Sequence, residues 1–244
     1  MLQIITILSV GVLVGILNGA AGGASILSFP VLVAAGLNPV SAAMTNAIGV
    51  FPANIFALVG KREKVLPIIK EHSKLLIAAS IGAFIGAMAL AILPEENFKK
   101  IVPFLLLIAS FSLLINVAPA LTAFERRLEI LLMTAIGIYC GYFGPGQGVM
   151  VIAVLARDAG RAIATVNISK NVIVAISNFF SNVVFIISGH VDWKFAFTLF
   201  IGASGGGYIG GRLVGKVSRN VYKSIIFTVG FASALWFFYK YWIK

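Results

Sequence analysis

Two glycine-rich stretches at matching positions decide how this chain folds. The first reads Asn18-Gly19-Ala20-Ala21-Gly22-Gly23-Ala24-Ser25, and the second reads Gly144-Pro145-Gly146-Gln147-Gly148. Each follows a long apolar segment, 2–18 or 128–143, and precedes a short one, 24–35 or 149–158. Because glycine readily adopts backbone conformations that interrupt a helix, each stretch predicts a break between a long helix and a short one.

The rest of the chain has the composition of an integral membrane protein. Of its 244 residues, 60% are hydrophobic and only 11% are charged, whereas a soluble chain carries about 25% charged residues. All eight acidic residues lie between apolar runs. The runs that approach the roughly 20 residues needed to cross a bilayer as a helix are 40–60, 72–93, 98–117, 162–189, 193–211 and 221–239. We therefore predict an all-α protein that crosses the cell inner membrane several times.

The charged and reactive residues exclude several other classes of protein. The net charge of +11 does not indicate a nucleic-acid partner, because the basic residues are scattered among short loops, as topology signals are. The single cysteine, Cys140, excludes an internal disulfide and a cysteine metal cluster. His72, in a basic loop, and His190 each lack a second histidine at ligand spacing, and no Ser-His-Asp or paired-carboxylate group lies in the apolar segments. We therefore expect no enzyme, metal site or cofactor.

The two breaks belong to a repeat of about 125 residues. Sliding the sequence by this offset superposes five pairs in the same order: Gly19 on Gly144, Gly23 on Gly148, Asn46 on Asn171, Gly82 on Gly207, and Gly86 on Gly211. A near-constant offset of this kind indicates duplication. We predict one membrane domain built from two repeats, 1–120 and 121–244, each with a broken helical segment followed by three full transmembrane helices.

Whether each broken segment crosses the membrane once or turns back as a hairpin decides the symmetry of the protein. A single crossing gives parallel repeats and distributes the loop Lys and Arg residues ten inside to eight outside. A hairpin gives inverted repeats and distributes them thirteen inside to five outside. Because loops rich in Lys and Arg stay in the cytoplasm, we predict inverted repeats with both termini external. The loops at 61–70 and 216–223 would then both be cytoplasmic, and the two hairpins would meet near the centre.

Both breaks are candidate sites for a bound anion. The N-terminus of each short helix would point free N–H groups at the ligand, and helix N-termini favour anions. Broken helices at corresponding positions of two repeats also indicate a transport site. The alternative is that the glycines only let helices pack closely. The breaks and the segment after the first predict these substrate-binding residues: Gly19, Gly22, Gly23, Ser25, Asn46, Gly144, Gly146, Gln147 and Gly148.

The segment 162–189 contributes the remaining candidates. Four amides fall on one narrow stripe of a helix there: Asn167, Asn171, Asn178 and Asn182. Polar side chains in a membrane helix face protein or an aqueous path, so the stripe either lines a pathway or holds helices together. Lys170 has no carboxylate partner in any membrane segment, and a buried ammonium without a counter-ion is costly. We expect an anionic substrate to supply the missing charge beside Lys170, Asn167 and Asn171, unless the lysine reaches the inner surface or is neutral.

Glycines spaced by four recur in each half on the long segment before the break and on the second of the three full transmembrane segments after it. They are Gly11 and Gly15, Gly82 and Gly86, Gly137 and Gly141, and Gly207, Gly211 and Gly215. Small residues at this spacing let two membrane helices approach closely. We predict that these glycines form helix-packing faces and have no chemical role.

The duplicated glycine-rich break, followed by Pro30 and the segment Ala43-Met44-Thr45-Asn46, resembles the TauE/SafE family of sulfite and sulfonate permeases. The resemblance covers nearly the whole chain. It implies an inner-membrane transporter for sulfur-containing anions such as sulfite, thiosulfate or organosulfonates. The residues that match by position are Gly19, Gly22, Gly23, Gly144, Gly146 and Gly148. The chain departs from the usual glycine triplet at Ala24 and Gln147, where a substrate would be recognised.

The leading hypothesis is a secondary transporter whose small anionic substrate binds near the membrane midplane between the two breaks. The alternatives are an anion channel, a transporter of a non-sulfur anion, and a membrane assembly subunit without transport activity. A transporter needs the breaks to line a solvated cavity, whereas an assembly subunit would bury the breaks where no water reaches them. The expected partners are the small anion and the lipid bilayer. The direction of transport, the coupling ion and the oligomeric state stay open, with a homodimer among the arrangements that the sequence allows.

Overall fold

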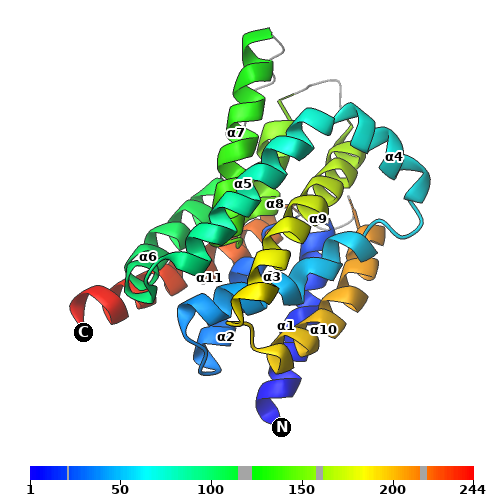
Figure 1. Cartoon of the computed structure of the whole chain (residues 1–244). Helices are drawn as coiled ribbons and strands as arrows, with labels where there is room; N and C mark the ends of the chain where they lie inside the picture. The colour runs from blue at the N-terminus through cyan, green and yellow to red at the C-terminus, as the bar shows by residue number, and fades with distance from the viewer. Residues whose placement is uncertain (21, 115–122, 158–161, 215–218) are drawn as a thin grey trace.

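The protein is described here by a computed structural model that covers residues 1–20, 22–114, 123–157, 162–214 and 219–244. These residues form helices and no strands, which confirms the predicted all-α class. The elements in chain order (Figure 1) are α1 (Leu2–Ala20), α2 (Ser25–Ala34), α3 (Pro39–Phe56), α4 (Arg62–Glu71), α5 (Ser73–Ile92), α6 (Glu95–Ser112), α7 (Ala123–Tyr142), α8 (Gln147–Leu155), α9 (Ile163–Ser188), α10 (Trp193–Arg212), α11 (Arg219–Phe238) and the short π-helix η1 (Tyr239–Ile243).

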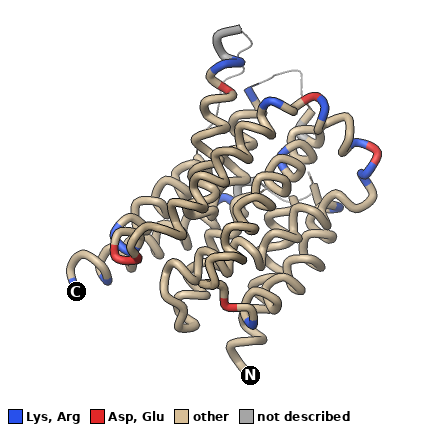
Figure 2. Tube along the Cα trace, viewed as in Figure 1, with Lys and Arg blue, Asp and Glu red and all other residues tan. Residues whose placement is uncertain are grey.

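The described helices have the surfaces of membrane-spanning segments. Those that are long and apolar enough to cross a bilayer by these two criteria are Leu2–Ala20, Ser73–Ile92, Ala164–Ser188 and Tyr222–Ile243. Figure 2 shows that the charged residues gather mainly at helix ends and in connections. Large apolar side chains such as Ile77, Ile187 and Phe197 are exposed on the helix bodies, which suits contact with lipid tails. The chain is a multi-pass membrane protein, in line with the predicted inner-membrane location.

Both predicted helix breaks are present. Before α2 begins, Gly22 and Gly23 have φ values of +88° and +87°. Before α8 begins, Gly144 and Gly146 both have a φ of +90°. These values lie in the left-handed region, which glycine adopts at little cost and other residues rarely occupy. Each long helix therefore ends where the backbone conformation of a glycine pair stops it.

Close contacts at small residues show in which direction the helices run. Along α10 they pair residues in rising order with both α1 and α3: Leu199 with Gly11, Ala203 with Gly15, Gly207 with Ala53, and Gly211 with Ala57. The helices α1 and α3 therefore both run parallel to α10, and so to each other. The chain between them must turn back through the first break and α2, because otherwise α3 would run opposite to α1.

The helices α3 and α9, which correspond under the 125-residue offset, run antiparallel. Ser188, the last residue of α9, donates a hydrogen bond to the sulfur of Met44 near the start of α3 at 3.3 Å. At the other end, Ile168 near the start of α9 belongs to one apolar cluster with Leu58, just beyond the end of α3. Figure 1 shows α7 beginning at the end of the molecule opposite the N-terminus, where α1 begins.

Each half of the chain packs against the other. The helix α1 lies along α10, and α7 lies along α5. The helices α3 and α9 cross near the centre, with α10 against α3 and α5 against α9. The helices α6 and α11 pair through aromatic contacts such as Phe104 with Phe238 and Phe111 with Phe227, and they lie beside α2.

The glycines spaced by four do form helix-packing faces. A Cβ on Gly15 would lie 2.6 Å from the carbonyl oxygen of Ala203, and one on Gly86 would overlap the carbonyl of Ile138. The helix α10 has two such faces, since Gly207 and Gly211 meet α3 while a further set meets α1. That set, which the spacing argument missed, is Gly202, Gly206 and Gly210. The predicted Gly215 lies outside the described residues.

The basic stretch around His72 is helical, where the sequence indicated a loop. The helix α4 packs Ile68 against Ile168 and exposes Arg62 and Lys64. Just before it, Lys61 donates a hydrogen bond of 2.7 Å to the carbonyl oxygen of Gly211, near the end of α10. Burial and the nearby charge of Lys64 lower the pKa of Lys61. The start of α4 and the end of α10 therefore lie on the same side of the protein.

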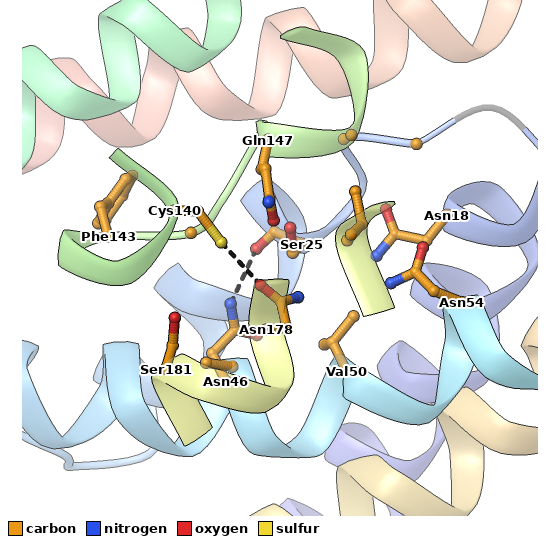
Figure 3. A pocket seen from close by; sticks show the side chains of 16 residues that line it. Asn18, Ser25, Asn46, Val50, Asn54, Cys140, Phe143, Gln147, Asn178 and Ser181 are labelled. Carbon is orange, nitrogen blue, oxygen red and sulfur yellow. Dashed lines mark hydrogen bonds between the residues drawn. The ribbon is translucent and has the colours of Figure 1, made fainter. Parts of the chain in front are cut away.

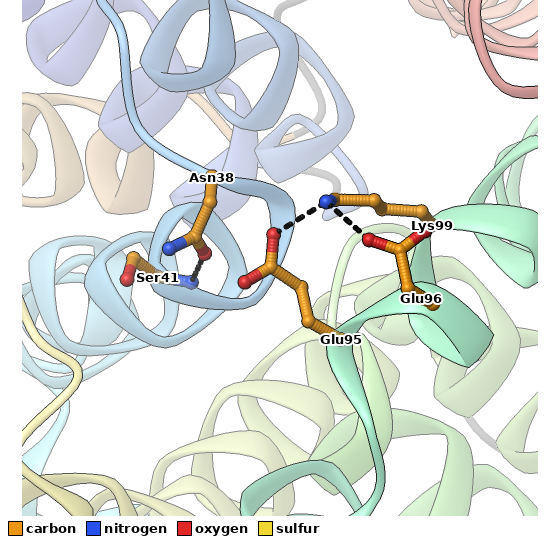
Figure 4. A network of polar contacts seen from close by, with 5 residues as sticks. All are labelled: Asn38, Ser41, Glu95, Glu96 and Lys99. Atoms are coloured by element: carbon orange, nitrogen blue, oxygen red, sulfur yellow. Dashed lines mark hydrogen bonds and ion pairs between the residues drawn. The ribbon is translucent and has the colours of Figure 1, made fainter.

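Figure 4 shows polar contacts at the start of α3 and at the start of α6. Asn38 accepts a hydrogen bond of 2.8 Å from the backbone N–H of Ser41 and so caps α3. Lys99 pairs with Glu95 at 2.9 Å and with Glu96 at 2.8 Å. These acids neutralise a neighbouring lysine at a helix start, so they are not available as counter-ions deeper in the protein.

Candidate functional site

The two breaks meet at the centre of the protein, as the sequence predicted. A Cβ on Gly22 would lie 3.0 Å from the carbonyl carbon of Gly148, and one on Gly148 would lie 3.1 Å from the Cα of Gly22. Only glycine lets the two backbones come this close. A cavity of about 40 Å³ lies beside the contact. Since a water molecule needs roughly 10–15 Å³ on the same measure, the cavity can hold a few waters or one small ion.

Polar but uncharged side chains line this cavity (Figure 3). They comprise five amides, two hydroxyls and one thiol: Asn18, Asn46, Asn54, Gln147, Asn178, Ser25, Ser181 and Cys140. Glycines and apolar residues complete the wall: Gly22, Gly23, Ala47, Val50, Phe143, Gly144, Gly148 and Val174. None of the described lining residues carries a charge.

Two crossing helices, α3 and α9, supply half of the eight polar side chains. Asn46, Val50 and Asn54 are spaced by four along α3, and Asn178 and Ser181 lie on one face of α9. Residues three or four apart share a face of an α-helix, so each helix turns one polar face to the cavity. The breaks close the remaining sides, with Asn18 from the last turn of α1 and Gln147 from the first turn of α8.

Hydrogen bonds occupy the amide oxygens of Asn18 and Asn178 and leave their N–H groups without an acceptor among the described residues. The Oδ1 of Asn18 accepts from the backbone N–H of Ala24 at 2.8 Å. The Oδ1 of Asn178 accepts from the thiol of Cys140 at 2.7 Å. Within the described residues, the Nδ2 groups of Asn18, Asn54 and Asn178 donate no hydrogen bond. The backbone N–H of Gly148 likewise has no acceptor there.

Other polar groups at the site are already paired. Asn46 accepts a hydrogen bond from Ser28 at 2.5 Å and donates one to the carbonyl of Ser25 at 3.4 Å. Gln147 donates to Ser177 at 3.2 Å. These contacts fix α2 and α8 against α3 and α9, which gives the cavity a defined shape.

The structure brings seven of the twelve predicted site residues to the cavity. They are Gly22, Gly23, Ser25, Asn46, Gly144, Gln147 and Gly148. Five do not line it: Gly19, Gly146, Asn167, Lys170 and Asn171. Gly146 instead approaches Ala109 of α6, where a Cβ would lie 2.8 Å from that side chain.

Lys170 and its two amide neighbours bind the end of α1. The lysine is fully buried, and its Nζ donates to the carbonyl oxygen of Asn18 at 2.5 Å and to the Oδ1 of Asn171 at 2.6 Å. The carbonyl oxygen of Gly19 accepts from the Nδ2 of Asn167 at 3.0 Å and of Asn171 at 3.5 Å. Lys170 lies directly behind the second break, with its Cδ 3.4 Å from the position of a Cβ on Gly148.

The sequence did not predict all of the residues that line the cavity, and only part of the predicted amide stripe on α9 reaches it. Asn178 lines the cavity, whereas Asn182 is buried elsewhere with an Oδ1 that has no partner among the described residues. Asn18, Asn54, Cys140 and Ser181 were not predicted as site residues. Asn46 and Asn54 are eight residues apart, about two helical turns, so helical periodicity places Asn54 on the same side of the segment 40–60 as Asn46.

Comparisons with known proteins agree with a transport role. The family model described as sulfite exporter TauE/SafE matches residues 7–237. The Escherichia coli K12 protein named probable membrane transporter protein YfcA is 26% identical over 230 residues, covering 90% of this chain and 84% of that protein. A Sinorhizobium protein named probable membrane transporter protein ORF9 is 26% identical over 233 residues, with 91% and 87% coverage. A Haemophilus influenzae probable membrane transporter protein is 24% identical over 231 residues, with 91% and 89% coverage. No solved structure matches the chain.

Proposed function

The chain belongs to the TauE/SafE family of membrane transporters, and we propose that it is a secondary transporter for a small sulfur-containing anion. The anion would bind in the cavity between the two helix breaks. The observation that carries this proposal is the set of amide N–H groups on Asn18, Asn54 and Asn178 that have no acceptor among the described residues; the amide oxygens of Asn18 and Asn178 are already engaged. Such a wall offers donors to an anion and few acceptors to a cation.

The charges around the cavity support an anion as well. No described lining residue is a carboxylate that could hold a cation. The ammonium of Lys170 lies one layer behind the break at Gly148, where a dry surrounding weakens the screening of its charge. The volume of about 40 Å³ favours a compact oxyanion such as sulfite or thiosulfate over an organosulfonate with a bulky tail.

A flux assay with purified protein in liposomes tests this proposal. We expect counterflow of sulfite or thiosulfate above the rate of protein-free liposomes, and less flux of a bulky aromatic sulfonate. Faster flux of a simple carboxylate than of any sulfur anion would indicate a transporter of another anion class. Ion currents without saturation would indicate a channel. Absence of flux for every anion in the panel would favour a membrane assembly subunit.

We further propose that residues 1–120 and 121–244 form inverted repeats of one membrane domain. Three observations support this: the pairing of residues at an offset of 125, the antiparallel arrangement of α3 and α9, and the return of the chain between α1 and α3. The hydrogen bond from Lys61 to Gly211 supports a common side for the connections after α3 and after α10. Inverted repeats with binding near the midplane are a recurring design of secondary transporters.

Accessibility of introduced cysteines tests the topology. In a Cys140→Ser background, a membrane-impermeant maleimide should label Lys194→Cys in intact cells but label Lys64→Cys and Arg212→Cys only after the membrane is permeabilised. This follows because Lys64 and Arg212 belong to the basic set assigned to the cytoplasm and Lys194 to the external set. Labelling of Lys64→Cys and Arg212→Cys from opposite sides would contradict inverted repeats and favour parallel ones.

A further inference from the structure

We propose that Lys170 is a positioning residue of the anion site, which holds the amide of Asn18 in the cavity by clamping the end of α1. The clamp consists of Asn167, Lys170 and Asn171, all on α9. This inference rests on the proposed anion site, and it differs from the expectation that Lys170 contacts the substrate directly.

The end of α1 needs such a clamp because it stops inside the protein. The last carbonyls of any helix lack partners within the helix, and Asn18 and Gly19 are buried in the protein. The carbonyls of Asn18 and Gly19 receive hydrogen bonds from Lys170 and Asn167, at 2.5 Å and 3.0 Å. Three side chains of α9 therefore bind two consecutive carbonyls of α1.

The same contact explains how a buried lysine persists without a carboxylate. A helix C-terminus has the equivalent of about half a negative charge, and a lysine that binds terminal carbonyls interacts favourably with it. The Oδ1 of Asn171 adds a second acceptor at 2.6 Å. Lys170 thus has a structural counter-charge in the end of α1, and it needs no bound substrate to be stable.

Asn18 connects the clamp to the cavity. Its carbonyl oxygen binds Lys170, its Oδ1 binds the N–H of Ala24 at the start of α2, and its side chain lines the cavity. Loss of the Lys170 contact would free the last turn of α1, and the Nδ2 of Asn18 would no longer have a defined position. The backbone of the second break separates Lys170 itself from the cavity, since Lys170 is not among the lining residues.

Within the described residues, the first half has no counterpart of the clamp. The offset of 125 aligns Lys170 with Thr45 and Asn18 with Phe143. Thr45, in α3, instead accepts a hydrogen bond of 3.0 Å from the backbone N–H of Asp192 and so binds the α9–α10 connection. The anion site is therefore asymmetric: an amide held by a lysine faces a phenyl ring at the equivalent position.

A double-mutant cycle on anion transport tests the clamp. Lys170→Met should raise the KM for the transported anion at least ~10-fold, which corresponds to about 1.4 kcal/mol. In an Asn18→Ala background the same change should raise KM less than about two-fold, because coupled residues are not additive. Asn54→Ala is the matched control, since Asn54 lines the cavity from α3 without contact to the clamp. The effects of Lys170→Met and Asn54→Ala should multiply.

If the KM of the double variant rose by the product of the increases in the two single variants, Lys170 and Asn18 would act independently. That result would overturn the proposal and indicate that Lys170 binds the anion itself. Lys170→Arg keeps the charge and the donors, so partial recovery of KM is expected, and no recovery in a folded Lys170→Arg protein would count against the clamp. Size-exclusion profiles and melting temperatures verify that each variant is folded.

The rate of modification of Cys140 gives a readout that needs no substrate. Cys140 is the chain's single cysteine and lines the cavity, so a small neutral thiol reagent reports access to the site. Lys170→Met and Asn18→Ala should each speed its modification several-fold, and the double variant should react no faster than the faster single one. Unchanged rates would overturn the clamp. If the expected rates occur but no anion is transported by the unaltered protein, the clamp stands and the proposed substrate fails.

Discussion

Replacing Gly148 with leucine should abolish anion transport while the protein stays folded in the membrane. A Cβ at this position would lie 3.1 Å from the Cα of Gly22 and 3.4 Å from the Cδ of Lys170. A leucine side chain would therefore separate the two breaks or fill the cavity, which is only about 40 Å³ in volume. The measurement is liposome flux at matched protein content, with a size-exclusion profile to verify folding.

Gly205→Leu is the matched control for Gly148→Leu. Gly205 also lies in a helix, but it is exposed, and a Cβ there would meet nothing within 4 Å. This variant should transport at the unaltered rate. Gly148→Ala should give an intermediate loss, because its single methyl group requires the neighbouring backbone to shift by only a few tenths of an ångström. Full flux in Gly148→Leu would mean that the substrate passes elsewhere.

Replacing Gly86 with valine should remove most of the folded protein. A Cβ on Gly86 would overlap the carbonyl oxygen of Ile138 and lie 2.8 Å from the backbone nitrogen of Tyr142. Overpacking typically costs about 1–3 kcal/mol, and more where the obstacle cannot move. Because backbone rather than a flexible side chain is the obstacle here, we expect a loss of roughly 3 kcal/mol or more. The α5–α7 pair would be forced apart along its length.

The yield of monodisperse protein and its melting temperature in detergent measure this effect. Gly205→Val is the control, since it introduces the same side chain in a helix where the space is open. Together, the two sets of glycine variants distinguish a role in transport from a role in folding. Substitutions at Gly148 should reduce transport while the protein stays folded, whereas the substitution at Gly86 should reduce the amount of folded protein. A normal melting temperature for Gly86→Val would show that α5 and α7 can separate without cost.

The helix breaks and the membrane class could be predicted from residues that act locally. Glycine pairs such as Gly22 and Gly23 interrupt a helix through their own backbone freedom, whatever surrounds them. Apolar segments of the right length form membrane helices because the bilayer leaves the backbone few other ways to satisfy its hydrogen bonds. Stripes such as Asn178 and Ser181 follow from helical periodicity alone. These features need no knowledge of which helix lies next to which.

The role of Lys170 could not be predicted in the same way. From the sequence, its burial and its lack of a carboxylate partner were both apparent, and an anionic substrate was the expected counter-charge. The partners that the structure supplies are the backbone carbonyl of Asn18 and the side-chain amide oxygen of Asn171. Every residue has such a carbonyl, so no sequence pattern distinguishes the one at the end of α1. The contact spans residues 152 positions apart in the chain.

The sequence by itself determined that this protein is helical, spans a membrane several times and has two glycine breaks at corresponding positions, because composition, periodicity and glycine stereochemistry act over a few residues. The charge distribution also predicted that the two breaks turn back and meet near the centre. Only the tertiary structure decided that Gly22 is the residue that touches Gly148, and that Asn54 and Cys140 share a cavity while Lys170 lies behind it. These outcomes depend on which helix faces pack together across the two halves. That choice is a property of all the helices jointly, since each close glycine contact requires a partner with matching space far away in the sequence.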